Sequence, residues 1–391
     1  MPLRRVPVLP PHAANTAPHP FPGGGSGVRR FVAGCMTGTS LDGLDAALVV
    51  ITGRGLALRA EVRRCLSRPL GRLAPRLRAL AEQERMSAGE IAALAREFAL
   101  LHLAALRELA GRRSLDLVSV HGQTVFHAPP LSWQLLNPAP IAAGLGVPVV
   151  HDLRAADLAR GGQGAPITPL SDYVLFRAPG RARLVVNLGG FCNVTWVPPE
   201  TVAHAKAIGR IAGGDVCACN QLLDALAREL FRKPYDEGGR RAARGRVRAA
   251  PFRALLKLLA AQARGGRSLG TGDELRGWLT RFADRHAVED LARCACACVA
   301  ETLVRRGAEL GRADELILAG GGVRNATLVR EIRARAGVPV MLSDACGVPA
   351  AYREAAGMAV LGALCQDRVP ITLPRVTGVR AAPVAGCWAL P

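Results

Sequence analysis

The sequence predicts an α/β protein of about two domains. Apolar, strand-like runs alternate along the chain with amphipathic helical segments, which is the pattern of α/β proteins. The chain has 391 residues, and roughly 100–200 residues make one domain. Glycine-rich turns fall near both ends and in the middle of the chain, which favours two similar lobes that close on a ligand. Half of the residues are hydrophobic and 21% are charged, a composition typical of globular proteins.

Residues 1–28 are expected to form a disordered tail, because they are rich in proline, glycine and small residues. Arginines without acidic residues are also a feature of mitochondrial transit peptides, but the prolines oppose the amphipathic helix of such a peptide. No apolar run reaches the ~18–20 residues that span a bilayer, and no secretion signal is recognised. We therefore expect neither a membrane protein nor a secreted one.

The net charge is +20, and the basic residues are almost all arginine. Such a charge indicates a polyanionic partner, but a coding bias toward arginine, alanine, glycine and proline explains it equally well. No zinc-finger spacing or aromatic RNA-binding signature is present, so we expect no specific nucleic-acid partner. Eleven cysteines without a secretion signal indicate free thiols in a reducing compartment, and the expected location is the cytoplasm.

The first half of the chain is expected to begin with a β-hairpin. Strands at Phe31–Met36 and Leu44–Ile51 surround the turn Thr37–Gly43, whose backbone amides can face an anion. A capping box at Ser87–Glu90 begins a helix that runs to about Leu109. Leu117–Val120 is a short buried strand that ends before His121.

The second half continues the alternation of strands and helices. Gly189–Gly190 lies between two strands, and Gly320–Gly322 follows a third. The proline-interrupted residues 369–391 are expected to wrap the surface. The other expected elements are strands at 184–187, 192–197, 316–318 and 338–342, and helices at 220–231, 325–336 and about 353–365.

Three glycine turns could hold a nucleotide. Gly38–Asp45 offers amides and hydroxyls for phosphate and carboxylates for a metal. Gly213–Asp215 is expected to be a turn that places a carboxylate beside a helix N-terminus. At Gly320–Asn325 the missing side chains let a base or sugar lie on the backbone. One such turn is weak support, whereas three in this order on alternating strands and helices favour a nucleotide site.

Other chemistries find no support in the sequence. The three lysines do not occur in a Gly-Lys-Ser/Thr step, which excludes a Walker phosphate loop, and Ser40 lacks the flanking glycines of a nucleophile elbow. Cys294, Cys296 and Cys298 lie on an expected helix, where successive members point about 200° apart. They are therefore expected to be packing residues, and no metal-ligating residues are assigned.

On these motifs the chain resembles the anhydro-N-acetylmuramic acid kinases, which share a superfamily with hexokinase, the seventy-kilodalton heat-shock chaperone and actin. The resemblance covers about residues 30–390 in one order. The matching segments are Gly34–Asp45, His121–Thr124, Asp152–Asp157, Gly161–Pro166, Asn187–Gly190 with Asn193, Lys233–Asp236, Gly320–Gly322 with Arg324 and Asn325, Asp344, and Leu373–Pro374 with Val376–Gly378.

The resemblance implies a two-lobed, actin-like ATPase (ribonuclease-H-like) fold with an interdomain cleft. It implies an N-terminal lobe at about residues 29–150 and a C-terminal portion at 151–391, with segments exchanged between them. It also implies ATP and Mg²⁺ as cofactors and a homodimer. The family phosphorylates 1,6-anhydro-N-acetylmuramic acid in peptidoglycan recycling and opens its anhydro ring with water, giving N-acetylmuramic acid 6-phosphate.

The resemblance also assigns roles to individual residues. Asp215 stands at the position of the family's catalytic aspartate, which implies a general base that activates water. The implied ATP contacts are Gly38, Thr39, Ser40, Leu41, Asp42, Gly43, Leu44, Asp45, Gly189, Gly190, Gly320, Gly321, Gly322 and Asn325. The implied substrate contacts are His121, Gln123, Arg154, Asp157, Gln163 and Glu354.

Three places depart from the family pattern, and one of them is Leu136–Asn137, where a Gly-Asp step is expected after Gln134. Residues 216–220 read Val-Cys-Ala-Cys-Asn where the family has Thr-Gly-Pro-Gly-Asn, and cysteines in place of positive-φ glycines would cost about 1 kcal/mol or more. Residues 266–274 keep only part of a Lys-Ser-Thr-Gly-Arg-Glu run. These departures leave open a related kinase with another sugar, or a pseudokinase that binds nucleotide or a polyanion. Structural roles also stay open, as turn or cap carboxylates (Asp42, Asp45, Asp215, Glu354), a core histidine (His121) or a solvated charge (Arg154).

Overall fold

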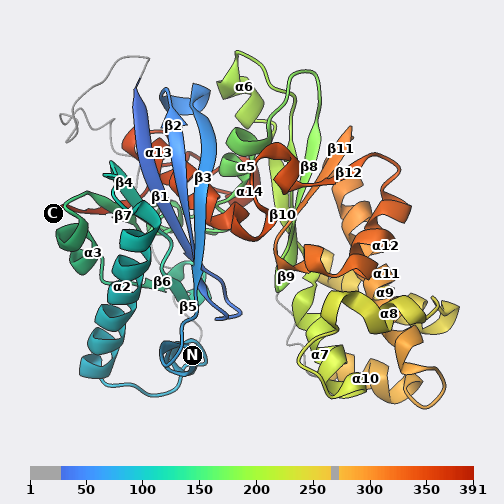
Figure 1. Ribbon diagram of the computed structural model, residues 1–391. Helices are drawn as coiled ribbons and strands as arrows, with labels where there is room; N and C mark the ends of the chain where they lie inside the picture. The colour runs from blue at the N-terminus through green and yellow to red at the C-terminus, as the bar shows by residue number, and fades with distance from the viewer. Residues whose placement is uncertain (1–27, 266–272) are drawn as a thin grey trace. The chain divides into compact units, whose positions relative to one another are not determined.

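A computed structural model describes residues 28–265 and 273–391 (Figure 1). Residues 1–27 of the expected tail and most of the departing 266–274 loop lie outside the described residues. The described chain divides into two compact units. Unit 1 takes the residues up to Leu175, Thr201–Ile211 and Tyr352–Pro391, and unit 2 takes Phe176–Glu200 and Ala212–Ala351.

Unit 1 is built on a six-stranded sheet in the order β13-β7-β4-β1-β2-β3. The first three strands of the chain pair antiparallel, and β4 and β7 continue the sheet parallel to β1. The expected hairpin is confirmed, with Thr37 opposite Leu44 at its closed end. The strands are β1 (Arg29–Thr37), β2 (Leu44–Thr52), β3 (Arg59–Arg68), β4 (Leu117–Val120), β7 (Val149–His151) and β13 (Cys387–Ala389).

Unit 2 repeats the same arrangement in a five-stranded sheet, β10-β9-β8-β11-β12. Its first three strands are also antiparallel, and β11 and β12 run parallel to β8. This repeat of one strand order confirms the α/β prediction with two ribonuclease-H-like units. The strands are β8 (Arg183–Leu188), β9 (Phe191–Val197), β10 (Ala212–Ala218), β11 (Glu315–Ala319) and β12 (Val340–Leu342).

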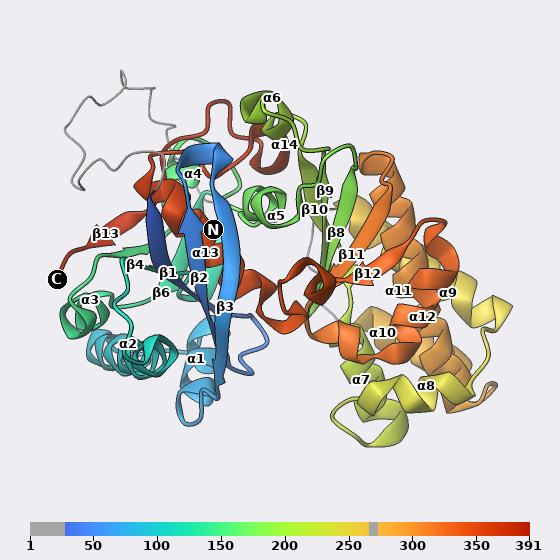
Figure 2. The same ribbon diagram turned by 45° about the horizontal axis from the view of Figure 1, so that its top comes forward.

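Helices cover both faces of the unit 1 sheet (Figures 1 and 2). Side chains from α1 and α2 share a core with Ala33 and Cys35 of β1. The alternate position of β1, Gly34, faces α13 at such close range that an added Cβ would lie 2.1 Å from the Ala355 carbonyl oxygen. The helices are α1 (Leu73–Ala81), α2 (Ala88–Ala110), α3 (Ala139–Leu145), α4 (Ala155–Ala159), α5 (Pro169–Phe176), α6 (His204–Ile208), α13 (Arg353–Gln366) and α14 (Pro374–Thr377).

In unit 2 the long helix α11 packs against β9 and β10 and lies between α9 and α12 (Figure 2). Cys294, Cys296 and Cys298 are buried on it, as expected for packing residues. The helices are α7 (Asn220–Phe231), α8 (Arg240–Arg244), α9 (Ala249–Gly265), α10 (Asp273–Phe282), α11 (Val288–Leu310) and α12 (Ala326–Ala336).

Two sequence expectations were wrong. Gly213–Asp215 is not a turn but part of strand β10, because glycine lets this strand approach β9, where a Cβ on Gly213 would lie 2.6 Å from the Val194 carbonyl oxygen. Residues 369–391 do not merely wrap the surface. They contribute α14 and strand β13, which pairs with β7, and residues such as Leu373 and Thr377 are buried.

The approximate domain limit at residue 150 lies inside β7, which pairs with β4 and β13 within unit 1.

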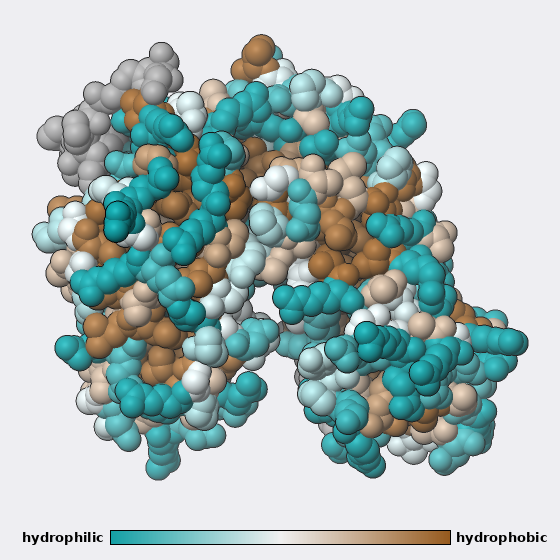
Figure 3. Space-filling model, viewed as in Figure 1, coloured by the Kyte–Doolittle hydropathy of each residue, from teal (hydrophilic) through white to brown (hydrophobic). Residues whose placement is uncertain are grey.

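Among residues 28–265 and 273–391, none of the helices combines the length and apolar character that a bilayer crossing requires. Figure 3 shows hydrophilic side chains interspersed with hydrophobic ones over the visible face of both units.

Candidate functional site

The turn of the β1–β2 hairpin carries polar groups on an apolar anchor. Thr39, Ser40 and Asp42 are exposed, and the Ser40 hydroxyl donates to Asp42 Oδ1 at 2.7 Å. Leu41 between them is buried, and it has a φ of 57°, a left-handed conformation that is costly for leucine. The turn thus places the side chains of Thr39, Ser40 and Asp42 at the surface on a buried leucine anchor.

Asp45, at the start of β2, is oriented by the neighbouring strand. The Ser67 hydroxyl of β3 donates to Asp45 Oδ1 at 2.5 Å and lies 3.0 Å from the Tyr352 hydroxyl. No group of three or more His, Cys, Asp or Glu side chains in the described part of the chain could hold a metal. Mg²⁺ commonly takes only one or two carboxylates and completes its shell with phosphate and water, and Asp42 and Asp45 offer carboxylates of the type that this ion takes.

His121, directly after β4, is buried and neutral. Its Nδ1 lies 2.8 Å from the Gly122 carbonyl oxygen, so this nitrogen carries the proton, and Nε2 accepts from Arg154 Nε at 3.2 Å and Nη2 at 2.9 Å. Burial, with the nearby Arg154 charge, lowers the pKa of His121 to about 3. Both ring nitrogens of His121 are therefore hydrogen-bonded, and one of them helps to orient Arg154.

Arg154 is held from two sides. Besides the bonds to His121, its Nη1 donates to the Gly164 carbonyl oxygen at 2.7 Å, and the side chain is partly exposed. A guanidinium fixed in this way is suited to a carboxylate or phosphate group. Arg154 thus links the end of β4 to the glycine loop at 161–164.

The other expected substrate contacts of unit 1 have different environments. Gln163 is exposed, whereas Asp157 is fully buried and accepts from the Gly164 amide at 2.8 Å and from Thr377 Oγ1 at 2.9 Å. Gln123 is 1% exposed, and its Oε1 has no hydrogen-bond partner within the described residues. The Asp157 carboxylate is therefore already hydrogen-bonded within the chain, whereas the Gln163 side chain faces solvent.

Glu354 is partly buried at the start of α13. Burial raises the pKa of its carboxyl, and the Asp172 and Asp45 charges add to this, against Arg353 and Arg154. Arg353 itself forms a buried ion pair with Asp172, in which its Nε donates to Asp172 Oδ1 at 2.8 Å. Unit 1 therefore brings Asp45, Arg154 and Glu354 within electrostatic reach of one another.

In unit 2, the turn Gly189–Gly190 caps helix α7. The Gly190 carbonyl oxygen accepts from the amides of Cys219 and Gln221 at 2.9 and 3.2 Å, and that of Gly189 accepts from Asn220 at 3.1 Å. These bonds use amides that an α-helix leaves unpaired at its N-terminus. The turn and the start of α7 are therefore one rigid structure.

The glycines after β11, Gly320–Gly322, include two that lie against the end of strand β8. Added Cβ atoms would lie 2.5 Å from Asn187 Oδ1 at Gly320 and 2.7 Å from Leu188 Cβ at Gly322, whereas Gly321 is exposed and its nearest contact would be at 3.9 Å. Asn325 caps α12 by accepting from the Leu328 amide at 3.0 Å. Packing thus accounts for Gly320 and Gly322, and Gly321 presents open backbone.

Asp215 lies on β10, an edge strand of the unit 2 sheet, and its side chain is exposed. It pairs with Asn193 of β9, and a β-bulge follows between Asp215 and Cys217. Bulges re-aim side chains and are frequent next to active sites. An exposed carboxylate at this bulge has the access to water that a general base needs.

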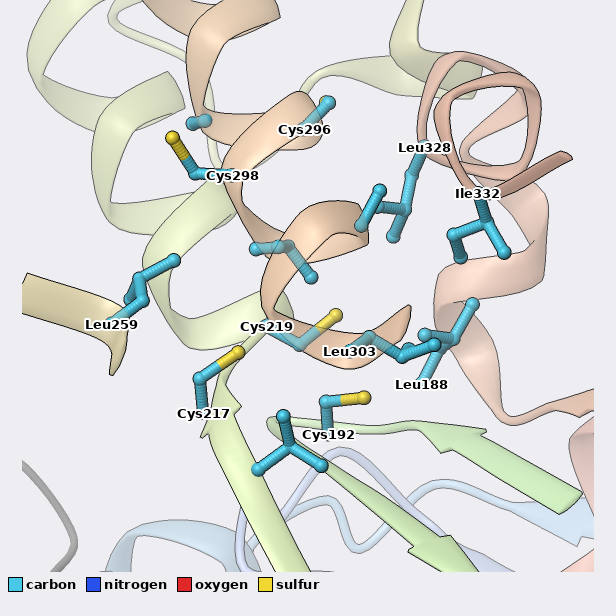
Figure 4. Close-up of a cluster of buried hydrophobic side chains, with 14 of the residues drawn as sticks. Leu188, Cys192, Cys217, Cys219, Leu259, Cys296, Cys298, Leu303, Leu328 and Ile332 are labelled. Atoms are coloured by element: carbon cyan, nitrogen blue, oxygen red, sulfur yellow. The ribbon is translucent and has the colours of Figure 1, made fainter. Parts of the chain in front are cut away.

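The two cysteines that replace family glycines do not have the positive φ that favours glycine. Cys219 has a φ of −120°, and Cys217 is not among the residues with positive φ. Both thiols point into the unit 2 core beside Cys192 and Leu303 (Figure 4). Burial raises the pKa of Cys217 to about 12, and that of Cys219 also lies far above the ordinary value, so these thiols are protonated packing groups that leave the outer side of the loop clear.

Some of the predicted residues lie at the carboxyl ends of the central parallel strands in each unit. β1 and β4 end at the hairpin turn and at His121, and β8 and β11 end at Gly189 and Gly320. Ligands of open α/β sheets bind at such strand ends. No role was predicted for Thr377, Asn187 or Asp172, because their contacts join residues that are far apart in the chain.

Comparison with known proteins gives one consistent result. A family model for anhydro-N-acetylmuramic acid kinase matches residues 30–389. A curated anhydro-N-acetylmuramic acid kinase of Salinibacter ruber is 35% identical over 390 residues, covering 93% of this chain and 97% of the relative. The enzyme of the same name from Bordetella parapertussis is 37% identical over 375 residues, covering 91% of this chain and 95% of the relative.

Proposed function

The chain belongs to the anhydro-N-acetylmuramic acid kinase family, and we propose that it phosphorylates 1,6-anhydro-N-acetylmuramic acid with ATP and opens the anhydro ring with water. The product is N-acetylmuramic acid 6-phosphate, an intermediate of peptidoglycan recycling in the cytoplasm. The observation that carries this proposal is the family match, which runs from residue 30 to residue 389 and so includes both units.

Phosphoryl transfer depends on positioning and charge neutralisation. The hairpin hydroxyls of Thr39 and Ser40 and the backbone amides of the turn bind the phosphates. Asp42 and Asp45 would hold Mg²⁺, which when bound neutralises charge on the transferring group. In unit 2, the exposed backbone of Gly321 contacts the nucleoside.

Ring opening requires a base. Asp215 takes a proton from water as its oxygen attacks the anomeric carbon, and the bond from that carbon to the bridging oxygen breaks. The bridging oxygen is released as O6 and accepts the γ-phosphoryl group, and ADP leaves. The β-bulge supports this role, because it orients an exposed carboxylate on a short, hydrogen-bonded strand.

The sugar is held by residues of unit 1. Arg154, fixed by His121 and Gly164, pairs with the carboxylate of the muramic lactyl group. Gln163 and Glu354 bind polar groups of the sugar ring, and burial raises the pKa of the Glu354 carboxyl.

The test is ADP release from the purified chain with ATP, Mg²⁺ and the anhydro sugar. We expect turnover in the native chain and turnover slowed by about a hundredfold or more in Asp215→Asn, which is the usual effect of removing a general base. Asp284→Asn removes another exposed aspartate of unit 2 and serves as the matched control, with turnover as fast as that of the native chain.

Three other outcomes would contradict the proposal in different ways. Turnover with another sugar alone indicates a related kinase with a changed substrate. Nucleotide binding without turnover indicates a pseudokinase. Full activity in Asp215→Asn removes Asp215 from the mechanism and leaves the family membership intact.

A further inference from the structure

We propose that Thr377, in the C-terminal segment, is a positioning residue for the sugar site and holds the glycine loop 161–164 in place through Asp157. The proposal rests on the function proposed above, since it concerns the loop and the arginine assigned to the sugar. Thr377 lies at the end of α14, and 220 positions separate it from Asp157. Nothing in the sequence alone brings these two residues together.

The contact between them is a buried, three-point junction. Thr377 Oγ1 donates to Asp157 Oδ1 at 2.9 Å, and the second carboxylate oxygen accepts from the Gly164 amide at 2.8 Å. The Thr377 carbonyl oxygen accepts from the Gln163 amide at 2.8 Å. Thr377 is 1% exposed and Asp157 is 0% exposed, so water cannot replace either partner at little cost.

The loop is shaped to fit this carboxylate. The Gly162 amide donates to the Asp157 carbonyl oxygen at 2.9 Å, and an added Cβ on Gly162 would lie 2.1 Å from Asp157 Oδ2. Gly164 has a φ of +66°, which an L-residue rarely adopts. Gly162 therefore lies directly against Asp157, and Gly164 is held by its hydrogen bond to the Asp157 carboxylate.

The hydrogen bonds of this junction continue to Arg154, the residue proposed to bind the sugar. The carbonyl oxygen of Gly164 accepts from Arg154 Nη1 at 2.7 Å, and the rest of this guanidinium bonds to His121. Gly164 therefore receives the Asp157 carboxylate at its amide and Arg154 at its carbonyl group. When Thr377 no longer holds Asp157, Gly164 and the Arg154 guanidinium lose a fixed position together.

This arrangement makes Asp157 a positioning residue as well. Both of its oxygens are committed to the chain, and it has no exposed surface for a ligand. The expected contact between Asp157 and the sugar is thus replaced by an indirect role, in which Asp157 and Thr377 act through Gly164 on Arg154.

The experiment compares Thr377→Val, which removes the hydroxyl at nearly constant volume, with Thr377→Ser, which restores it. Thr372→Val is the matched control, because Thr372 lies in the same segment, is also 1% exposed, and its hydroxyl has no hydrogen-bond partner within the described residues. All are made in the full chain, and hydrogen exchange of the peptide containing residues 157–164 is measured with the KM values for the anhydro sugar and for ATP.

In Thr377→Val we expect exchange of this peptide and the KM for the sugar each to rise about tenfold, the factor that corresponds to about 1.4 kcal/mol. The KM for ATP and kcat stay within twofold, Thr377→Ser recovers most of the loss, and Thr372→Val behaves as the native chain. A purely structural threonine would lower the melting temperature and leave the ratio of the two KM values unchanged, which would overturn the proposal.

Two further results keep the test decisive. Asp157→Asn changes the junction without touching Thr377 and must accelerate exchange of the same peptide, so unchanged exchange overturns the proposal even if Thr377→Val does not fold. If the native chain does not turn over the sugar, the proposed function fails, while the exchange rates still decide whether Thr377 holds the loop.

Discussion

Gly320, Gly321 and Gly322 follow one another in the chain and have three different environments. Gly320 combines a φ of +85° with the contact to Asn187, and Gly322 is pressed against Leu188. Gly321 has open space where a side chain would be. Of these three, only Gly321 has no close contact that requires a glycine, which is what the proposed nucleoside contact at this backbone predicts.

We therefore expect Gly321→Ala to weaken ATP binding about tenfold or more and to leave the melting temperature unchanged, because the added methyl meets only the ligand. Titration with ATP and thermal unfolding check the two parts. In Gly322→Ala the methyl meets Leu188, and we expect a loss of about 1–3 kcal/mol of stability. Equal ATP affinity in Gly321→Ala and the native chain would show that the nucleoside does not lie on this turn.

The sequence identified the positions of the site better than the roles of its residues. The turns at Gly38–Asp45 and Gly320–Gly322 could be located from residue types, and the catalytic role of Asp215 rests on the resemblance and stays a prediction. The hydrogen bond between Asp157 and Thr377 could not be predicted, because it joins residues that are 220 positions apart in the chain. His121 shows the same limit, because its burial and its bonds to Arg154 are set by tertiary packing.

At the scale of elements, the contact between β1 and α13 decides where the hairpin turn lies. Gly34 lets the strand approach the helix so closely that a Cβ would also lie 2.3 Å from the Ala359 amide nitrogen. These atoms are backbone and cannot move aside as a flexible side chain would. The small residues of α13 complete this contact, and the hairpin turn follows directly at the end of β1.

Gly34→Ala is accordingly expected to destabilise unit 1 by about 3 kcal/mol, at the upper end of the overpacking range. Urea unfolding monitored by circular dichroism measures the loss. Gly89→Ala is the matched control, since nothing lies within 4 Å of an added Cβ at this position of α2. A Gly34→Ala protein as stable as the control would mean that the strand and the helix are less tightly packed than described.

Elements with a clean periodic pattern were predictable, and elements that depend on a partner were not. The capping box of α2 and the limits of α7 are confirmed, because both are encoded locally. Strand β10 was missed because its glycines resemble a turn until β9 is placed beside it. Strand β13 has three residues and exists only through its pairing with β7.

At the scale of the whole molecule, both units use one topology and place their candidate residues at equivalent strand ends. The hairpin turn after β1 corresponds to the Gly189–Gly190 turn after β8. The two units nevertheless differ in their cores, since unit 2 fills the region behind its loop with thiols from three elements (Figure 4). The side chains of Cys217 and Cys219 are thus part of the unit 2 core.

Stability of the whole chain is expected to fall between pH 6.5 and about 4. Burial lowers the pKa of His102 to about 4 and that of His121 to about 3, so the unfolded chain takes up protons first as the pH falls. Each histidine then removes about 1.4 kcal/mol of unfolding free energy per pH unit. Urea unfolding at pH 7, 6 and 5 measures this slope. His102→Leu is expected to reduce the slope by the contribution of one proton, about 1.4 kcal/mol per pH unit. An unchanged slope would mean that His102 titrates normally in the folded chain.

The mass of the reaction product tests the central claim most directly. With ATP and 1,6-anhydro-N-acetylmuramic acid, the chain is expected to give a sugar heavier than the substrate by one water and one phosphoryl group, and Asp215→Asn is expected to give none. A product that has gained a phosphoryl group without water, or a native chain that leaves the sugar unchanged, would contradict the claim that this family member couples ring opening to phosphorylation.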